Sequence, residues 1–153
     1  MKSKTLYIAY GSNLNLTQMA CRCPTAKVVG TSELKDYELL FRGSRHSAVA
    51  TVEPYKGGRV PVLLWTLKEK DLQALDRYEG YPHFYRKEIF PVELKGKTVP
   101  AMAYIMNDGH PFGAPSDHYL NTILEGYESA GFDTEVLEQA VEKSIRLAEE
   151  QQP

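Results

Sequence analysis

The stretch 5-TLYIAYGSN-13 predicts a β-strand that runs directly into a tight turn. Residues 5–10 alternate and are rich in residues that favour strands, and Gly11-Ser12-Asn13 is expected to end the strand. A short helix is expected next, because Asn15 and Gln18 have the spacing of a capping box. The fold is therefore expected to start from a strand, a glycine turn and a helix in succession.

Outward from this stretch, strand-like alternation dominates up to residue 67 and helices dominate the end of the chain. We expect strands over 27–29, 37–41, 48–52 and 60–67, and then over 84–94 and 98–106. Lys56-Gly57-Gly58 is expected to be a hairpin turn, because paired glycines supply the positive φ angles of a primed turn. Helical spacing predicts helices over 68–79, 116–130 and 134–150. This order predicts an α+β fold with flanking helices, in which a small, mixed but mostly antiparallel sheet is strongly curved or closed into a barrel.

The composition indicates one globular domain, residues 1–153, and excludes several classes of partner. The net charge of −2 supplies no basic field for a phosphate backbone, so no nucleic-acid partner is expected. The apolar runs are far shorter than the roughly 20 residues that span a bilayer, and no secretory signal is recognised. Cys21 and Cys23 are too close together for an ordinary disulfide, so we expect free thiols in a reducing cytoplasm.

The sequence also disfavours a metal site and a nucleotide-binding fold. Its four histidines are scattered, with no pair four residues apart and no neighbouring cysteine ligands. Neither a G-x-G-x-x-G nor a Walker motif occurs. We therefore expect no bound metal and no nucleotide cofactor.

The turn 10-YGSNL-14 is the first candidate functional site. A strand that passes through glycine into a helix leaves backbone N–H groups without partners, and such a turn can hold a carboxylate or an oxyanion. The Ser12 hydroxyl and the Asn13 amide would add orientable hydrogen bonds. The alternative is structural: Gly11 only makes the turn and Asn13 caps the helix. Ser12 is not expected to be a hydrolase nucleophile, because the G-x-S-x-G motif is absent.

The segment 72-LQALDRYEG-80 is the second candidate site. Glu79 shares a helix face with Leu75, which should be buried, and Gly80 should end the helix directly after it. Burial and the helix dipole would both raise the pKa of this carboxyl. The alternatives are that Glu79 reaches solvent or pairs with a nearby cation, namely Arg77, Arg86 or Lys87. A glycosidase-like carboxylate pair between Glu79 and Asp76 is a weaker hypothesis.

Three segments together, 10-YGSNL-14, 75-LDRYEG-80 and 115-PSDHY-119, resemble the γ-glutamylcyclotransferase-like (AIG2-like) family. The resemblance implies a small mixed barrel with flanking helices. It implies an enzyme that releases 5-oxoproline from γ-glutamyl compounds without metal or organic cofactor. By position, it implies Glu79 as the acid/base residue, substrate binding by Tyr10, Gly11, Ser12, Asn13 and Leu14, and a pocket lined by Tyr85 and Tyr119.

In the implied reaction, the α-amine of the γ-glutamyl group closes onto the γ-carbonyl and expels a free amine or amino acid. One alternative keeps this chemistry on a γ-glutamyl-amine or a carrier-tethered metabolite, with glutathione a weaker candidate. Candidate contacts for the leaving group are Arg45, His46, Tyr81, His83 and the loop 109–116. A second alternative is a non-catalytic small-molecule binding module. The strand-rich edge and the tyrosines could also support a homodimer.

Overall fold

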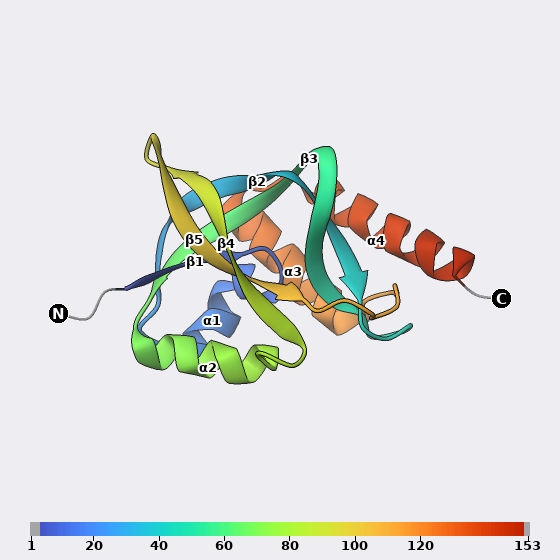
Figure 1. The fold of residues 1–153 in the computed structure, drawn as a ribbon, viewed down its shortest axis with the longest axis horizontal. Helices are drawn as coiled ribbons and strands as arrows, with labels where there is room; N and C mark the ends of the chain where they lie inside the picture. Colours follow the sequence, from blue (N-terminus) through green and yellow to red (C-terminus); the bar gives the residue numbers. More distant parts are fainter. Residues whose placement is uncertain (1–3, 152–153) are drawn as a thin grey trace.

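The computed structural model describes residues 4–151. In chain order, its elements are β1 (Thr5–Ala9), the 3-10 helix η1 (Ser12–Leu14), α1 (Leu16–Arg22), β2 (Lys27–Arg42), β3 (Val49–Leu67), α2 (Glu69–Glu79), β4 (Tyr85–Leu94), β5 (Lys97–Met106), α3 (Asp117–Ala130) and α4 (Thr134–Glu150). Figure 1 shows the strands crossing the centre of the molecule, with the helices packed around them. No helix within residues 4–151 is both long enough and apolar enough to cross a membrane.

The five strands form one sheet in the order β2-β3-β1-β5-β4. The β1–β5 pair is parallel, and the other three pairs are antiparallel. The expected α+β fold with a mixed, mostly antiparallel sheet is therefore confirmed. Across residues 4–151 no hydrogen-bonded ladder joins the outer strands β2 and β4, so the sheet is curved and open rather than a closed barrel. Side chains approach across this gap instead, with the Tyr37 and Phe90 rings packed edge to face at 5.2 Å between centroids.

The expected hairpin turn at Lys56-Gly57-Gly58 is wrong. These residues lie inside the single long strand β3, and the segments expected as separate strands merge into β2 and β3. The pairing shifts from Lys35 with Arg59 to Tyr37 with Pro54, so β3 carries extra residues in a bulge. Gly57 has a φ of 84°, and its N–H donates to Asp36 Oδ1 at 2.9 Å. The positive φ that suits a primed turn suits a bulge equally well, because both need a backbone that glycine adopts without strain.

The helix α3 is held against the turn that follows β1. Gly126 faces this turn so closely that an added Cβ would lie 2.6 Å from the Leu14 Cβ and 2.8 Å from the Leu14 carbonyl carbon. The Asn15 side chain donates to the Thr122 carbonyl oxygen at 3.0 Å and to Glu125 Oε1 at 3.0 Å. The fold therefore fixes the turn from behind, through a close backbone approach and two hydrogen bonds.

Candidate active site

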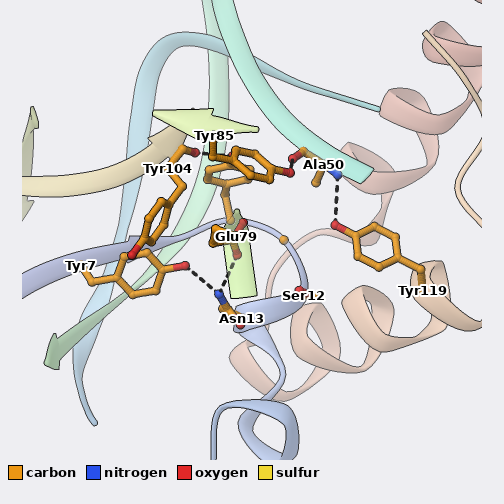
Figure 2. Close-up of a pocket in the computed structure, with 10 residues that line it drawn as sticks. Tyr7, Ser12, Asn13, Ala50, Glu79, Tyr85, Tyr104 and Tyr119 are labelled. Carbon is orange, nitrogen blue, oxygen red and sulfur yellow. Dashed lines mark hydrogen bonds between the residues drawn. The ribbon is translucent and has the colours of Figure 1, made fainter. Parts of the chain in front are cut away.

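A small cavity, partly open to solvent, lies at the end of β1, where strands from both halves of the sheet meet two helices. It is lined by Tyr7, Tyr10, Gly11, Ser12, Asn13, Ala50, Glu79, Tyr85, Tyr104 and Tyr119 (Figure 2). Seven of the eight residues expected to form the site lie on this wall. The exception is Leu14, which is fully buried in the core. None of the candidate leaving-group residues, including Tyr81 and His83, is on the wall of the described cavity.

The turn after β1 presents the Asn13 side chain to the cavity. Asn15 caps α1 instead, since its Oδ1 accepts from the Gln18 N–H at 3.1 Å. The Asn13 amide is therefore available to the cavity, and its Nδ2 donates to the Tyr7 hydroxyl at 2.8 Å and to Glu79 Oε1 at 3.5 Å. The alternative in which Asn13 caps the helix is wrong.

Gly11 lets the turn approach β3 closely. A Cβ at this position would lie 3.1 Å from the Ala50 Cβ and 3.7 Å from the Tyr119 hydroxyl oxygen. Within the turn, the Leu14 N–H donates to the Gly11 carbonyl and the Asn15 N–H donates to the Ser12 carbonyl. In this turn, the candidate backbone donors for an anion are consequently the N–H groups that precede Leu14.

Glu79 is the last residue of α2, and Gly80 follows it in the left-handed conformation with a φ of 67°, as expected. The carboxyl reaches the cavity, and burial raises the pKa of Glu79 to about 7, against the lowering effects of the Arg22 charge and the Asn13 hydrogen bond. Burial was one of the two causes expected from the sequence. Because protein groups replace much of the water around this half-buried side chain, its ionised form is destabilised.

Two of the three cations expected as alternative partners of Glu79, Arg86 and Lys87, pair with other carboxylates, and among the described residues no ion pair joins Arg77 to Glu79. Lys87 Nζ lies 3.0 Å from Asp76 Oδ1, and Arg86 Nε lies 2.6 Å from Glu88 Oε2. Asp76 Oδ1 also accepts a hydrogen bond from the Tyr104 hydroxyl at 2.6 Å. Asp76 is thus engaged in orienting a cavity tyrosine, and nothing in this arrangement favours a carboxylate pair with Glu79.

Two tyrosines hold the backbone of Ala50, one at its N–H and the other at its carbonyl oxygen. The Tyr85 hydroxyl donates to the Ala50 carbonyl oxygen at 2.6 Å, whereas the Tyr119 hydroxyl accepts from the Ala50 N–H at 3.0 Å (Figure 2). Burial raises the pKa of both phenols, so they stay protonated and neutral near pH 7. Tyr119 accepts in this contact and therefore keeps its own proton for another acceptor.

Four residues of the site were not expected from the sequence. Tyr7 and Tyr104 line the cavity, and their rings pack edge to face with centroids 5.8 Å apart. Ala50 contributes its backbone, which no residue pattern reveals. Arg22 lies behind Asn13, and its Nη1 donates to the Asn13 Oδ1 at 2.6 Å. For Arg22, the one sequence feature that could have pointed to this role is its four-residue spacing from Gln18, which places both side chains on one helix face.

The site combines a carboxyl whose pKa lies near neutral pH with neutral hydrogen-bond donors in a small cavity. Such a carboxyl accepts a proton and returns it with little free-energy cost at pH 7. Within residues 4–151, no group of three or more histidine, cysteine, aspartate or glutamate side chains gathers in a way that could hold a metal ion. The chemistry that these residues themselves can perform is proton transfer on a small bound molecule.

Known proteins are similar to this chain in sequence and in fold. The family model described as gamma-glutamyl cyclotransferase, AIG2-like, matches residues 7–126. Gamma-glutamylcyclotransferase of Homo sapiens is 28% identical over 142 residues, which cover 87% of this chain and 75% of the human protein. The Mus musculus protein of the same name is also 28% identical over 142 residues, with the same coverage of both chains.

Solved structures agree with the sequence matches. One described as gamma-glutamyl cyclotransferase superposes with a TM-score of 0.80 at 27% identity, covering 90% of this chain and 86% of that chain. YkqA from Bacillus subtilis superposes with a TM-score of 0.77 at 23% identity, covering 95% of this chain and 55% of that chain, and shows a shared fold. Because the matching family model runs from β1 through the Glu79 helix and into α3, the chain belongs to the gamma-glutamyl cyclotransferase, AIG2-like family.

Proposed function

We propose that this chain is an enzyme of the γ-glutamylcyclotransferase type that cyclises a γ-glutamyl amide or peptide to 5-oxoproline and releases the free amine or amino acid. The observation that carries this proposal is Glu79, whose pKa burial raises to about 7, at the wall of a small cavity lined by the turn after β1 and by tyrosines. The family assignment and the names of the relatives support the same reaction class.

In the proposed reaction, the α-amine nitrogen of the substrate attacks its own γ-carbonyl carbon. A ring C–N bond forms, the C–N bond to the leaving amine breaks, and no water is consumed. The attacking nitrogen changes from an ammonium to a ring amide and so loses two protons, while the leaving nitrogen gains two and departs as an ammonium at pH 7. Glu79 takes the first proton from the attacking ammonium and gives it to the leaving nitrogen, and the ionised carboxylate then takes the second proton from the ring nitrogen and releases it toward the departing amine. Because nucleophile and electrophile belong to one molecule, the cavity only has to hold the bent conformer to gain a high effective molarity.

The raised pKa of Glu79 matters because an ammonium is not a nucleophile. An α-amine has a pKa of about 8 and an ordinary glutamate about 4.3, which is a mismatch of about 5 kcal/mol for proton transfer. A carboxyl with a pKa of about 7 removes most of this mismatch while remaining able to protonate the leaving group.

The remaining cavity residues are proposed to bind the γ-glutamyl group. Backbone N–H groups of Gly11 to Asn13 would hold either the substrate α-carboxylate or the oxyanion of the tetrahedral intermediate. Tyr119 retains a hydroxyl proton to donate to the substrate, because the Ala50 N–H occupies its acceptor side. Tyr10 and Tyr85 shape the wall, with their hydroxyls donating to carbonyl oxygens of Tyr104 and Ala50.

The setting of the reaction also remains a proposal. We propose a small-molecule γ-glutamyl substrate and a cytoplasmic location, which the two free thiols, exposed Cys21 and buried Cys23, support. The homodimer stays a prediction that size-exclusion chromatography with light scattering would check.

The reaction is tested by incubating the purified protein with γ-glutamyl-α-amino acids, γ-glutamyl-ε-lysine, γ-glutamyl-alkylamines and glutathione. Mass spectrometry then measures 5-oxoproline and the released amine in equal amounts. We expect product from at least one class, and the ranking of kcat/KM identifies the leaving group. Saturable binding with no product from any class would contradict the cyclotransferase and favour the binding module.

The first prediction concerns pH. For the free enzyme, kcat/KM is expected to rise about tenfold per pH unit below pH 7 and to level near pH 7, because Glu79 must be ionised to accept a proton. It should fall again above the pKa of the substrate amine, since the ammonium form binds and then transfers its proton. Initial rates between pH 5 and pH 10 check this profile, and an acidic limb near pH 4.5 would contradict the assigned base.

A second prediction concerns Ser12, whose Oγ lies 3.4 Å from the Tyr78 hydroxyl oxygen. Ser12→Ala should lower kcat/KM by about 1 to 2 kcal/mol, or roughly fivefold to thirtyfold, because only one neutral hydrogen bond is lost. Steady-state kinetics and intact-protein mass spectrometry provide the measurement. Complete loss of activity in the folded variant, together with a covalent glutamyl adduct on the wild type, would identify Ser12 as a nucleophile instead.

A further inference from the structure

Arg22, the last residue of α1, joins three elements behind the cavity. Its Nη1 donates to Asn13 Oδ1 at 2.6 Å. Its Nη2 donates to Gln18 Oε1 at 2.9 Å and to the Tyr78 hydroxyl at 2.7 Å. The guanidinium also stacks on the Tyr78 ring, with its Cζ 3.7 Å from the ring centroid. The side chain is therefore held by α1, by the turn and by α2 at once.

This contact determines which way the Asn13 amide points. A guanidinium has only donors, so the end of the amide that faces Arg22 must be its oxygen. The opposite end, Nδ2, is consequently directed at the Tyr7 hydroxyl and at Glu79 Oε1. Without Arg22, the amide could turn over and present its oxygen to the Glu79 carboxylate, which repels it.

We propose that Arg22 is a positioning residue of this site, which fixes the Asn13 amide so that its Nδ2 donates to Glu79 and which supplies the positive charge behind that pair. The proposal rests on the proposed cyclisation for its catalytic meaning. Arg22 is not on the cavity wall and would act through Asn13 and through its charge, not by contact with the substrate.

The other titratable side chains that act on the pKa of Glu79 are neutral near pH 7, so the positive charge of Arg22 is the main charge effect on it. Arg22 lowers the pKa of Glu79, opposing the larger effect of burial. The other titratable side chains that interact electrostatically with Glu79 come from β1, the turn, β4, β5 and α3, and they are Tyr7, Tyr10, Tyr85, Tyr104 and Tyr119. Burial raises the pKa of each of these phenols, so they remain neutral through the working pH range.

Two substitutions of Arg22 separate the effect of its positive charge from its effect on the orientation of the Asn13 amide. Arg22→Lys keeps a positive charge but lacks the planar fork that reaches Asn13, Gln18 and Tyr78 together. Arg22→Gln removes the charge and the fork. An exposed arginine on the adjacent helix, Arg77, offers a matched control, because Arg77→Gln changes the net charge equally and lies two residues from Glu79.

The experiment measures kcat and the pH profile of kcat/KM for the wild type and these three variants. Arg22→Gln is expected to lower kcat at least about tenfold and to move the acidic limb up by about one pH unit. Arg22→Lys should lower kcat severalfold while leaving the limb near that of the wild type. Arg77→Gln should leave both unchanged. In a protein that already carries Asn13→Ala, adding Arg22→Gln should change kcat less than twofold, because the positioning role of Arg22 acts through Asn13. The same addition should still move the acidic limb of the kcat/KM profile to higher pH, because the positive charge is lost.

A merely structural role would lower kcat without moving the limb, and that result would overturn the proposal, as would equal effects of Arg22→Gln and Arg77→Gln. A fully additive Asn13→Ala and Arg22→Gln pair would also overturn it. Carbon-13 NMR of the Glu79 carboxyl gives a reading that needs no turnover: its titration midpoint should rise in Arg22→Gln and not in Arg77→Gln. If the wild type makes no 5-oxoproline, the proposed function fails, and the midpoints still decide whether Arg22 acts on Glu79.

Discussion

Glu79→Gln is expected to lower the rate of 5-oxoproline formation at least about a hundredfold, because the amide keeps the shape of the side chain but cannot accept the proton of the substrate ammonium. The loss should lie in kcat more than in KM, since the γ-glutamyl group would still be held by the turn and the tyrosines. Steady-state kinetics at pH 7.5 on the substrate with the highest wild-type kcat/KM provide the measurement. Near-normal turnover of the folded variant would remove Glu79 from the mechanism.

The free energy of unfolding of Glu79→Gln gives an independent check on the raised pKa of Glu79, because the direction of its pH dependence is fixed by that pKa. A carboxyl whose pKa is raised from 4.5 to about 7 stabilises the folded state most when protonated, and this contribution is lost as the pH rises through 7. The loss amounts to about 3 kcal/mol at most. Glu79→Gln avoids it, so the variant should match the wild type in urea denaturation near pH 4.5 and exceed it at pH 8. Exposed Glu128→Gln on α3 should show no such pH-dependent difference.

Gly126→Ala is expected to destabilise the protein by about 1 to 3 kcal/mol, although the same change in an exposed helix would stabilise it. The added Cβ would lie 2.6 Å from the Leu14 Cβ and 2.8 Å from the Leu14 carbonyl carbon, and backbone cannot move aside as a flexible side chain can. Relief requires that α3 and the turn separate. Because this turn carries Ser12 and Asn13, a shift approaching 1 Å should also lower kcat/KM by roughly tenfold to a hundredfold.

Urea denaturation and steady-state kinetics measure both effects. Asn121→Ala is the matched control, because Asn121 is exposed on the same helix and the change raises helix propensity without a clash. The control should be as stable as the wild type or more stable, with unchanged activity. If Gly126→Ala proved equally harmless, the close approach of α3 would not hold the turn.

The elements that could be predicted best carry their signals locally. The helix that ends at Glu79 is followed by Gly80, which adopts the left-handed conformation that a C-terminal cap requires. The strand-turn-helix order around Gly11 followed equally from local residue types. By contrast, the bulge at Gly57 could not be distinguished from a hairpin turn, because both need the same backbone conformation and only strand pairing distinguishes them.

Asn13 and Asn15 also show which features local sequence predicts and which depend on tertiary packing. Asn13 and Asn15 are equivalent as residue types, and only the spacing of Asn15 and Gln18 favoured Asn15 as the helix cap. The structure gives the cap to Asn15, whose amide is also held by α3, and directs Asn13 into the cavity. The cap at Asn15 was therefore predictable from local spacing, whereas the direction of the Asn13 amide depends on its contact with Arg22 and so on how the helices pack.

The sequence by itself therefore determined the order of the helices and the strand-rich regions, the glycine turn and the helix end that carries Glu79, because neighbouring residues encode backbone conformation directly. Only the tertiary structure decided that the sheet stays open, that Tyr7, Tyr104 and the Ala50 backbone complete the cavity, and that Arg22 stands behind Asn13. It also decided the size of the Glu79 pKa shift. The physical reason is that desolvation and hydrogen-bond orientation depend on groups brought together from distant parts of the chain.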